Sequence, residues 1–183
     1  LPIYHVHGLF VAIHCALLSG SRLLWLPKFD AREVTALLPK ASVMMGVPTF
    51  YTRLLAEPSF GRHASDPVRL FVSGSAPLLP ETFREFEGRT GKRILERYGM
   101  TETIMNLTNP AVGERRPGTV GRPFPGQEAR IVDLKPRRPL GPNEIGEIEV
   151  RGPHVFAGYL NQPAATAECF GAEGWFRTGD LGQ

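Results

Sequence analysis

A hydroxyl beside a carboxylate in mid-chain, Thr101 followed by Glu102, is the pair of residues in this sequence with the clearest chemical use. The pair follows a short β-like run and stands in a Gly-x-Thr-Glu turn. A hydroxyl can donate to a phosphate oxygen, and a neighbouring carboxylate can hold a Mg²⁺ that screens the phosphates of a nucleotide. Alone, such a turn is equally well a capped connection between a strand and a loop. It indicates a nucleotide site only when other segments support it.

A second carboxylate, Asp180, stands near the end of the chain after Thr178 and Gly179. The two oxygens of a carboxylate can accept hydrogen bonds from both vicinal hydroxyls of a ribose. An isolated Thr-Gly-Asp is more often a plain turn, so this residue also needs its context.

Three small residues, Gly74, Ser75 and Ala76, follow a predicted strand over residues 69–73. The end of a parallel strand is a favoured ligand position in open α/β sheets, and small residues let an adenine or an acyl group lie against the backbone. A tight strand-to-helix turn would also require Gly here, and both interpretations can hold together.

The elements that must position these residues alternate between helix and strand over residues 8–106. Asp30 with Glu33 forms a capping-box pattern, and Phe83 and Phe86 share one face of a helix that begins at Pro80. Strand-helix-strand order of this kind predicts a mainly parallel sheet covered by helices. The predicted helices are 8–18, 30–38, one after Pro48 and one from Pro80 to Gly88 or Gly91; the predicted strands are 22–26, 42–45, 69–73 and 93–97.

Beyond about residue 107, Pro and Gly become dense. Short strands are predicted over residues 128–132 and 147–151, a turn over 141–143, and a helix over 163–169. This half of the chain therefore reads as a small β-rich lobe.

The bulk composition is that of an ordinary soluble protein, with 42% hydrophobic and 21% charged residues among 183. A net charge of +3 with scattered Arg and Lys does not indicate nucleic-acid binding. No apolar stretch is long enough for a membrane helix. The two cysteines, Cys15 and Cys169, have no metal spacing and fit a reducing, cytoplasmic setting.

Five ordered motifs, at residues 1–8, 72–78, 96–102, 146–153 and 175–182, resemble the acyl-adenylate-forming enzymes, the family of acyl-CoA synthetases, luciferases and peptide-synthetase adenylation domains. Residues 1–9, 44–53 and 96–102 look closest to its malonyl-CoA synthetases. The resemblance implies a flavodoxin-like α/β lobe over residues 1–106 with the acyl and adenylate site. A small barrel-like β lobe over 107–183 would carry the ribose-binding Asp180.

The resemblance also implies the reaction. The carboxylate of an acid attacks the α-phosphate of ATP, pyrophosphate leaves, and CoA then displaces AMP. Thr101 would bind phosphate, Glu102 would bind Mg²⁺, Tyr98 would stack on adenine, and His7 would line the carboxylate site. The other residues that the resemblance places around the nucleotide are Gly74, Ser75, Ala76, Glu96, Gly99 and Met100. His5 and His7 could instead suggest a metal site, but no acidic or Cys partners lie nearby in the sequence.

Arg97 is the predicted determinant of the substrate, together with His7 and Ser75. By resemblance it lines the acyl pocket, where a guanidinium that cannot lose its proton needs an anion. A second carboxylate on the substrate would supply that anion, which predicts malonate or methylmalonate. Arg97 could instead pair with Glu96 or another acid and brace the turn, and many acyl-CoA synthetases with other substrates carry Arg here. The alternative substrate class is a medium-chain or aryl monocarboxylate. Arg53 and Arg69 are weaker candidates for the same anion.

Three elements of the family have no counterpart in these residues: the phosphate loop before residue 1, the hinge after Asp180, and the small C-terminal domain with its catalytic Lys. We therefore expect both ends to be cut and the isolated chain to be catalytically inactive, retaining at most nucleotide binding. We also expect exposed apolar surface and self-association.

Overall fold

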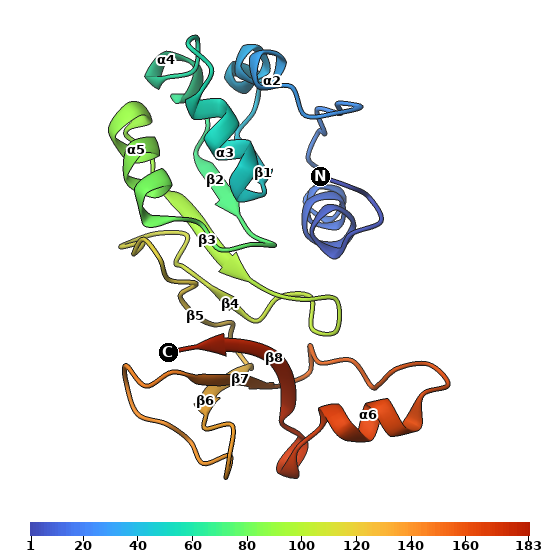
Figure 1. The fold of residues 1–183 in the computed structure, drawn as a ribbon. Coiled ribbons are helices and arrows are strands. Elements are labelled where there is room, and N and C mark those ends of the chain that lie inside the picture. The colour runs from blue at the N-terminus through green and yellow to red at the C-terminus, as the bar shows by residue number, and fades with distance from the viewer. The chain divides into compact units, whose positions relative to one another are not determined.

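The computed structural model describes residues 1–183, apart from the side chain of residue 172, and divides into two compact units (Figure 1). The first unit comprises Leu1–Thr101 and Leu107–Arg122, and the second comprises Glu102–Asn106 and Pro123–Gln183. The division of functions at residues 106 and 107, with the acyl and adenylate site before it and the ribose-binding aspartate after it, stays a prediction.

The first unit is built on a five-stranded sheet with the order β1-β2-β3-β4-β5. Strands β1 (Val43–Gly46), β2 (Leu70–Ser73) and β3 (Ile94–Tyr98) are parallel. Strand β4 (Leu107–Thr108) is antiparallel to β3, and β5 (Arg122–Pro123) completes the sheet. The predicted mainly parallel sheet is therefore confirmed, and its carboxyl edge lies at Gly46, Ser73 and Tyr98.

Helices connect the parallel strands where the sequence predicts them. Asp30 caps α2, its side chain accepting a hydrogen bond from the Glu33 backbone at 2.9 Å. Helix α5 ends at Gly91, whose φ of 72° is the left-handed conformation that glycine adopts freely. The helical elements are the π-helix η1 (His7–His14), α1 (Cys15–Leu18), α2 (Ala31–Leu37), the 3₁₀-helix η2 (Leu38–Lys40), α3 (Pro48–Leu55), α4 (Arg62–Ser65) and α5 (Pro80–Thr90).

The core of the first unit is aromatic, and it holds the sheet to α3 and α5. Phe86 is fully buried and its ring contacts the rings of Tyr51, Phe60 and Phe71. The Tyr51 hydroxyl donates to the Val72 carbonyl at 2.5 Å, which satisfies the one polar atom that this ring brings inside.

The predicted strand over residues 22–26 is wrong: this segment has no regular structure. It pairs with no strand in the described chain, and a β-strand needs a partner to satisfy its backbone groups. The side chains of its residues 22–25 are exposed, including Leu23, Leu24 and Trp25. The apolar run that suggested a strand is a local signal, whereas a strand is stabilised by the pairing.

The second unit contains a three-stranded antiparallel sheet with the order β6-β7-β8. Strands β6 (Glu128–Val132) and β7 (Gly146–Arg151) match the predicted runs, and helix α6 (Pro163–Cys169) has the predicted bounds. The 3₁₀-helix η3 (Ala172–Gly174) leads into β8 (Phe176–Gly182), which the sequence did not predict as a strand.

None of the helices in the described residues combines the length and the apolar character needed to cross a membrane.

Candidate functional site

The carboxyl edge of the parallel sheet brings three of the predicted site residues together. His7 comes from the start of η1, Ser75 follows β2, and Arg97 lies in β3. His7 Nδ1 lies 3.1 Å from Ser75 Oγ, and Arg97 Nη2 lies 3.5 Å from His7 Nε2. Because a guanidinium only donates, Nε2 must be the accepting nitrogen, so Nδ1 holds the proton and donates to Ser75.

The backbone after β2 makes room for this cluster. A Cβ on Gly74 would lie 3.3 Å from the Arg97 carbonyl oxygen and 3.5 Å from His7 Cε1, so a side chain there would crowd both residues. Ser75 has a φ of 69°, which is uncommon for a residue other than glycine. Such conformations cluster at ligand sites, where the surrounding structure holds them. Ala76 is exposed beside Ser75.

Arg97 is a largely buried guanidinium that no carboxylate contacts among the described residues. Its Nη2 also donates to Met45 Sδ at 3.5 Å, and its Nε is buried without a hydrogen-bond partner. Burial lowers the pKa of Arg97 to about 10. The alternative prediction, that Arg97 pairs with Glu96 or another acid, is therefore contradicted by the contacts.

Glu96 points elsewhere, as the alternation of side chains along a strand requires. Its Oε1 accepts from the Leu78 backbone at 2.8 Å, while Oε2 is buried without a partner. Desolvation by burial raises the pKa of this carboxyl. Its predicted place in the nucleotide site stays a prediction.

His7 is 4% exposed and neutral at physiological pH. Desolvation, followed by the charge of Arg97, lowers the pKa of His7 to about 4. A neutral imidazole beside a guanidinium adds no second positive charge to the cluster, so the region keeps the net +1 of Arg97.

The lowered pKa of His7 should make the free energy of unfolding depend on pH. Between pH 4 and 6.5 the unfolded chain binds a proton at His7 that the folded chain does not, so the stabilisation is complete above pH 6.5 and is lost as pH falls towards 4. We expect the free energy of unfolding to fall by about 3 kcal/mol more in the native protein than in His7→Gln between pH 7 and 4. Denaturant unfolding at several pH values measures this, and parallel curves for the two proteins would contradict it.

The turn after β3 contains the remaining residues of the mid-chain motif. Tyr98 is the last residue of β3, Gly99 and Met100 follow it, and Thr101 is exposed in the turn. Glu102 begins the 102–106 segment of the second unit.

Within the second unit, Glu102 is held at both its backbone and its side chain. Its carbonyl oxygen accepts from the Phe156 backbone at 2.8 Å, and its Oε1 accepts from the Tyr159 hydroxyl at 3.0 Å. That hydrogen bond raises the pKa of Tyr159.

A magnesium ion bound with a nucleotide suits this single carboxylate. No group of three or more His, Cys, Asp or Glu that could hold a metal occurs in the described part of the chain. Mg²⁺ in nucleotide sites is usually held by one or two carboxylates together with phosphate oxygens and waters. Glu102 uses Oε1 for Tyr159, and its second oxygen can serve as the protein ligand.

Asp180 lies in a bulge of strand β8. Glu147 pairs with Leu181 and Glu149 with Arg177, so three residues of β8 stand opposite one residue of β7. Thr178, Gly179 and Asp180 are these three. Asp180 is exposed on the second unit.

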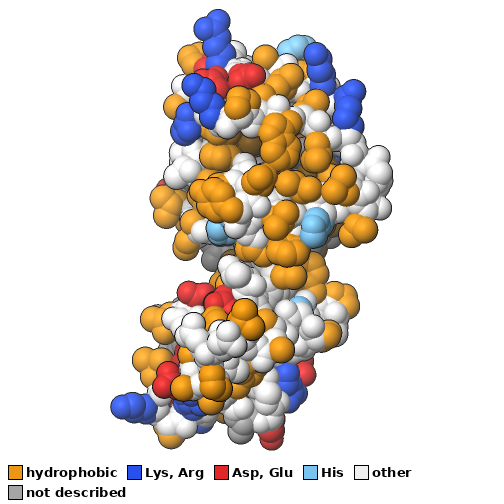
Figure 2. All heavy atoms as spheres, turned by 90° about the vertical axis from the view of Figure 1, so that its right-hand side faces the viewer, with side chains coloured by type: hydrophobic (Ala, Val, Ile, Leu, Met, Phe, Trp, Pro, Cys, Tyr) orange, Lys and Arg blue, Asp and Glu red, His pale blue; other side chains and the backbone are white. Residues whose placement is uncertain are grey.

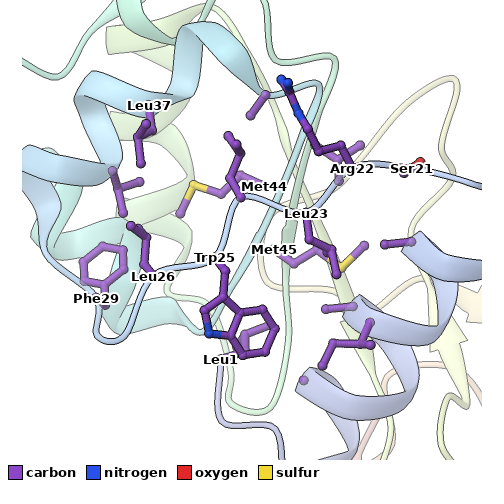
Figure 3. Close-up of a pocket in the computed structure, with 18 of the residues that line it drawn as sticks. Leu1, Ser21, Arg22, Leu23, Trp25, Leu26, Phe29, Leu37, Met44 and Met45 are labelled. Carbon is purple, nitrogen blue, oxygen red and sulfur yellow. The ribbon is translucent and has the colours of Figure 1, made fainter.

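A hollow of about 1180 Å³ lies in the first unit between η1, the segment 19–29 and β1 (Figure 3). Met44, Met45 and Trp25 line it, as do Arg53 and Arg69. Its lining in the described chain does not include His7, Ser75 or Arg97. Arg53 donates to the Phe29 carbonyl and lies over the Phe29 ring. The two weaker anion candidates, Arg53 and Arg69, thus line this hollow, which shares Met45 with the contacts of Arg97.

Hydrophobic side chains gather on the face of the first unit seen in Figure 2. Large apolar residues at least 39% exposed near the start of the chain are Ile3, Tyr4, Phe10, Leu17, Leu18, Leu23, Leu24 and Trp25. The expected exposed apolar surface is thus present, while self-association stays a prediction.

Two residues that contact the predicted site residues were not themselves predicted from the sequence. Met45 reaches Arg97 from β1, and Tyr159 reaches Glu102 across 57 positions of sequence. Met45 could have been found from its place at the end of a predicted parallel strand. For Tyr159 the sequence contains no signal, because the contact depends on a loop conformation.

Comparisons with known proteins identify relatives of this chain. Residues 1–160 match the family described as AMP-binding enzyme. The chain is 37% identical to the mitochondrial malonate–CoA ligase of Bos taurus, over 98% of this chain and 37% of that protein. The ATP-bound MatB structure from Rhodopseudomonas palustris is 51% identical, with a TM-score of 0.98 over 100% of this chain and 36% of that one.

A malonyl-CoA ligase with methylmalonyl-CoA and AMP bound is 44% identical, with a TM-score of 0.89 over 99% of this chain and 40% of that one. The chain spans about a third of the length of the curated relatives that it matches.

Proposed function

Because the chain belongs to the AMP-binding enzyme family, we propose that it is the acid- and nucleotide-binding part of an acid–CoA ligase acting on malonate or methylmalonate. The observation that supports this best is Arg97, a largely buried guanidinium that no protein carboxylate contacts in the described chain. A buried charge without a counter-ion is costly, and a second carboxylate on the substrate would supply one. The relatives named as malonate ligases support the same substrate class.

The cluster around Arg97 suits a small diacid. Arg97 binds one carboxylate, and neutral His7 with Ser75 lines the space for the other. Protonated His7 would compete with Arg97 for the same anion, so the lowered pKa of His7 keeps the site selective for one bound charge near Arg97. Neighbouring Gly74 leaves the space that a side chain would fill.

The nucleotide would be bound mainly by residues of two motifs, the one at 96–102 and the one at 175–182. Thr101 donates to a phosphate, Asp180 accepts from the ribose hydroxyls, and Tyr98 stacks on adenine. Glu102 would hold Mg²⁺, which when bound neutralises phosphate charge. We assign the other predicted contacts to the backbone and side chains of Gly74, Ser75, Ala76, Glu96, Gly99 and Met100.

The reaction then has two transfers. A carboxylate oxygen of the acid bonds to the α-phosphorus of ATP as the bond to the pyrophosphate oxygen breaks. The CoA sulfur next bonds to the acyl carbon, loses its proton, and AMP leaves. The residues assigned here bind and orient the reactants, which is where most of the rate enhancement of such transfers arises.

Acid-dependent exchange of pyrophosphate into ATP tests this function in the whole protein that contains this chain. We expect malonate and methylmalonate to support exchange at least about tenfold faster than propionate, because a paired buried charge is worth more than 1.4 kcal/mol. Propionate is the matched control, since it is methylmalonate without the second carboxylate.

Two results would separate the parts of the proposal. Faster exchange with hexanoate or benzoate than with malonate would overturn the dicarboxylate assignment and favour the monocarboxylate alternative. No exchange with any acid would overturn the ligase activity itself.

The cytoplasmic setting also stays a proposal. It is supported by Cys15 and Cys169, which are both free thiols in the structure. Free thiols fit a reducing compartment.

A further inference from the structure

The bulge that contains Asp180 is anchored by two side chains, that of Thr178 within the bulge and that of Glu147 on the neighbouring strand β7. The Thr178 hydroxyl donates to the Ile148 carbonyl at 2.7 Å and accepts from the Asp180 backbone at 3.1 Å. The Gly179 backbone, at a φ of 75°, donates to Glu147 Oε1 at 3.1 Å. Two consecutive backbone N–H groups that the bulge removes from the strand ladder are thus satisfied by side chains.

Glu147 is an unusual residue to find under such a bulge. It is 6% exposed, and its neighbour on the same face, Glu149, is 2% exposed. Two carboxylates this deeply buried require counter-ions, because a buried unpaired charge is strongly unfavourable. Arg130 and Arg137 supply the charges.

Each of the four carboxylate oxygens of Glu147 and Glu149 accepts at least one hydrogen bond. Arg130 donates twice to Glu149 Oε2, at 2.8 and 2.7 Å, and Arg137 donates to Glu149 Oε1 at 3.1 Å. Arg137 also donates to Glu147 Oε2 at 2.8 Å. Three of the four carboxylate oxygens are therefore taken by guanidinium groups, and the fourth holds the Gly179 backbone.

A purely stabilising role accounts poorly for this arrangement. Replacing buried ion pairs by apolar residues is often neutral or stabilising, so such a cluster is weak evidence for stability. Bulges, by contrast, occur next to functional sites, where they redirect a side chain. The cluster contacts the bulge that contains the proposed ribose ligand, Asp180.

We propose that Glu147, oriented by Arg137, is a positioning residue that fixes the Gly179–Asp180 bulge for recognition of the ribose diol, with Thr178 as its second anchor. This rests on the proposed function, because it requires Asp180 to bind the ribose. Glu147 itself touches no nucleotide in this scheme.

The variant Glu147→Gln tests the proposal with little change of shape. Both oxygens of Glu147 accept hydrogen bonds, whereas an amide offers only one acceptor, so the variant must lose either the Gly179 or the Arg137 contact. The readout is the ratio of the dissociation constants for 2′,3′-dideoxy-AMP and AMP, measured by calorimetry on the whole protein. This ratio isolates the diol contact, and general destabilisation would weaken binding of both nucleotides alike.

We expect Glu147→Gln to reduce the ratio roughly tenfold, the size of one charge-assisted hydrogen bond. Thr178→Val removes the anchoring hydroxyl and should also reduce the ratio. Thr178→Ser keeps this hydroxyl and should have the native ratio. The matched control is Glu128→Gln, which removes a carboxylate from the same sheet that pairs with Arg151 and does not contact the bulge. Its ratio should equal the native one.

A native ratio in both Glu147→Gln and Thr178→Val would overturn the positioning role. If Glu147→Gln does not fold, the positioning role is tested by comparing this ratio between Thr178→Val and Thr178→Ser. Asp180→Ala distinguishes the ribose assignment from the positioning role. If Asp180→Ala loses diol discrimination while the Glu147 and Thr178 variants keep it, only the positioning role is overturned. Unchanged discrimination in Asp180→Ala overturns the ribose assignment and the positioning together.

Discussion

Replacing Arg97 with Gly is expected to lower kcat/KM for malonate by about 10²- to 10³-fold, equivalent to about 3–4 kcal/mol. The reason is that the second carboxylate of malonate would then enter a mostly buried space without a counter-charge. Propionate has no such group, so its kcat/KM should rise or stay unchanged. The measurement is steady-state AMP formation with each acid in the presence of CoA.

Two further variants make this result specific. Arg97→Lys keeps the charge but cannot form a bidentate pair, so we expect an intermediate loss of malonate activity. Arg53→Met removes an exposed guanidinium that lies over Phe29 and should change malonate activity less than about threefold, as is usual for exposed surface charges. Malonate activity that survives in Arg97→Gly would refute the second-carboxylate assignment.

The helices of this chain were predictable because their signals are local. Asp30 and Glu33 mark one helix start, and Pro163 begins α6 at the first helical position. The apolar pair Phe83 and Phe86 identified the buried face of α5. In each case a few neighbouring residues hold all the information that the element needs.

The strands were less predictable because they depend on partners. Residues 22–26 have a strand-like composition and no pairing, whereas β8 has a Gly and an Asp within it and pairs with β7. Composition alone would rank the first above the second. Pairing reverses that order, since backbone hydrogen bonds outweigh side-chain preference.

The candidate site divides in the same way. His7, Ser75 and Arg97 were predicted from motifs, and the parallel order of β2 and β3 places Ser75 and Arg97 at one edge. The contact between Glu147 and Gly179 was not predictable, because it spans 32 positions and requires both the register of β7 with β8 and the bulge.

Replacing Glu102 with Gln is expected to slow malonate-dependent pyrophosphate exchange by about 10²- to 10³-fold, the usual cost of removing one group that stabilises developing charge. Gln has the same shape and can still accept from the Tyr159 hydroxyl, so the hydrogen bond at 3.0 Å can remain. The variant loses the negative charge of the carboxylate, which we propose binds Mg²⁺. The half-saturating magnesium concentration should therefore rise in this variant.

Tyr159→Phe is the matched control for Glu102, because it removes the hydrogen bond and leaves the carboxylate charge. We expect its exchange rate to change less than about fivefold, the equivalent of one neutral hydrogen bond of about 1 kcal/mol, and its magnesium dependence to stay native. AMP binding measured without magnesium should be equal in both variants and the native protein. If Glu102→Gln shows the native magnesium dependence, the carboxylate does not hold the metal, and its place in the turn is explained by the contacts to Phe156 and Tyr159 alone.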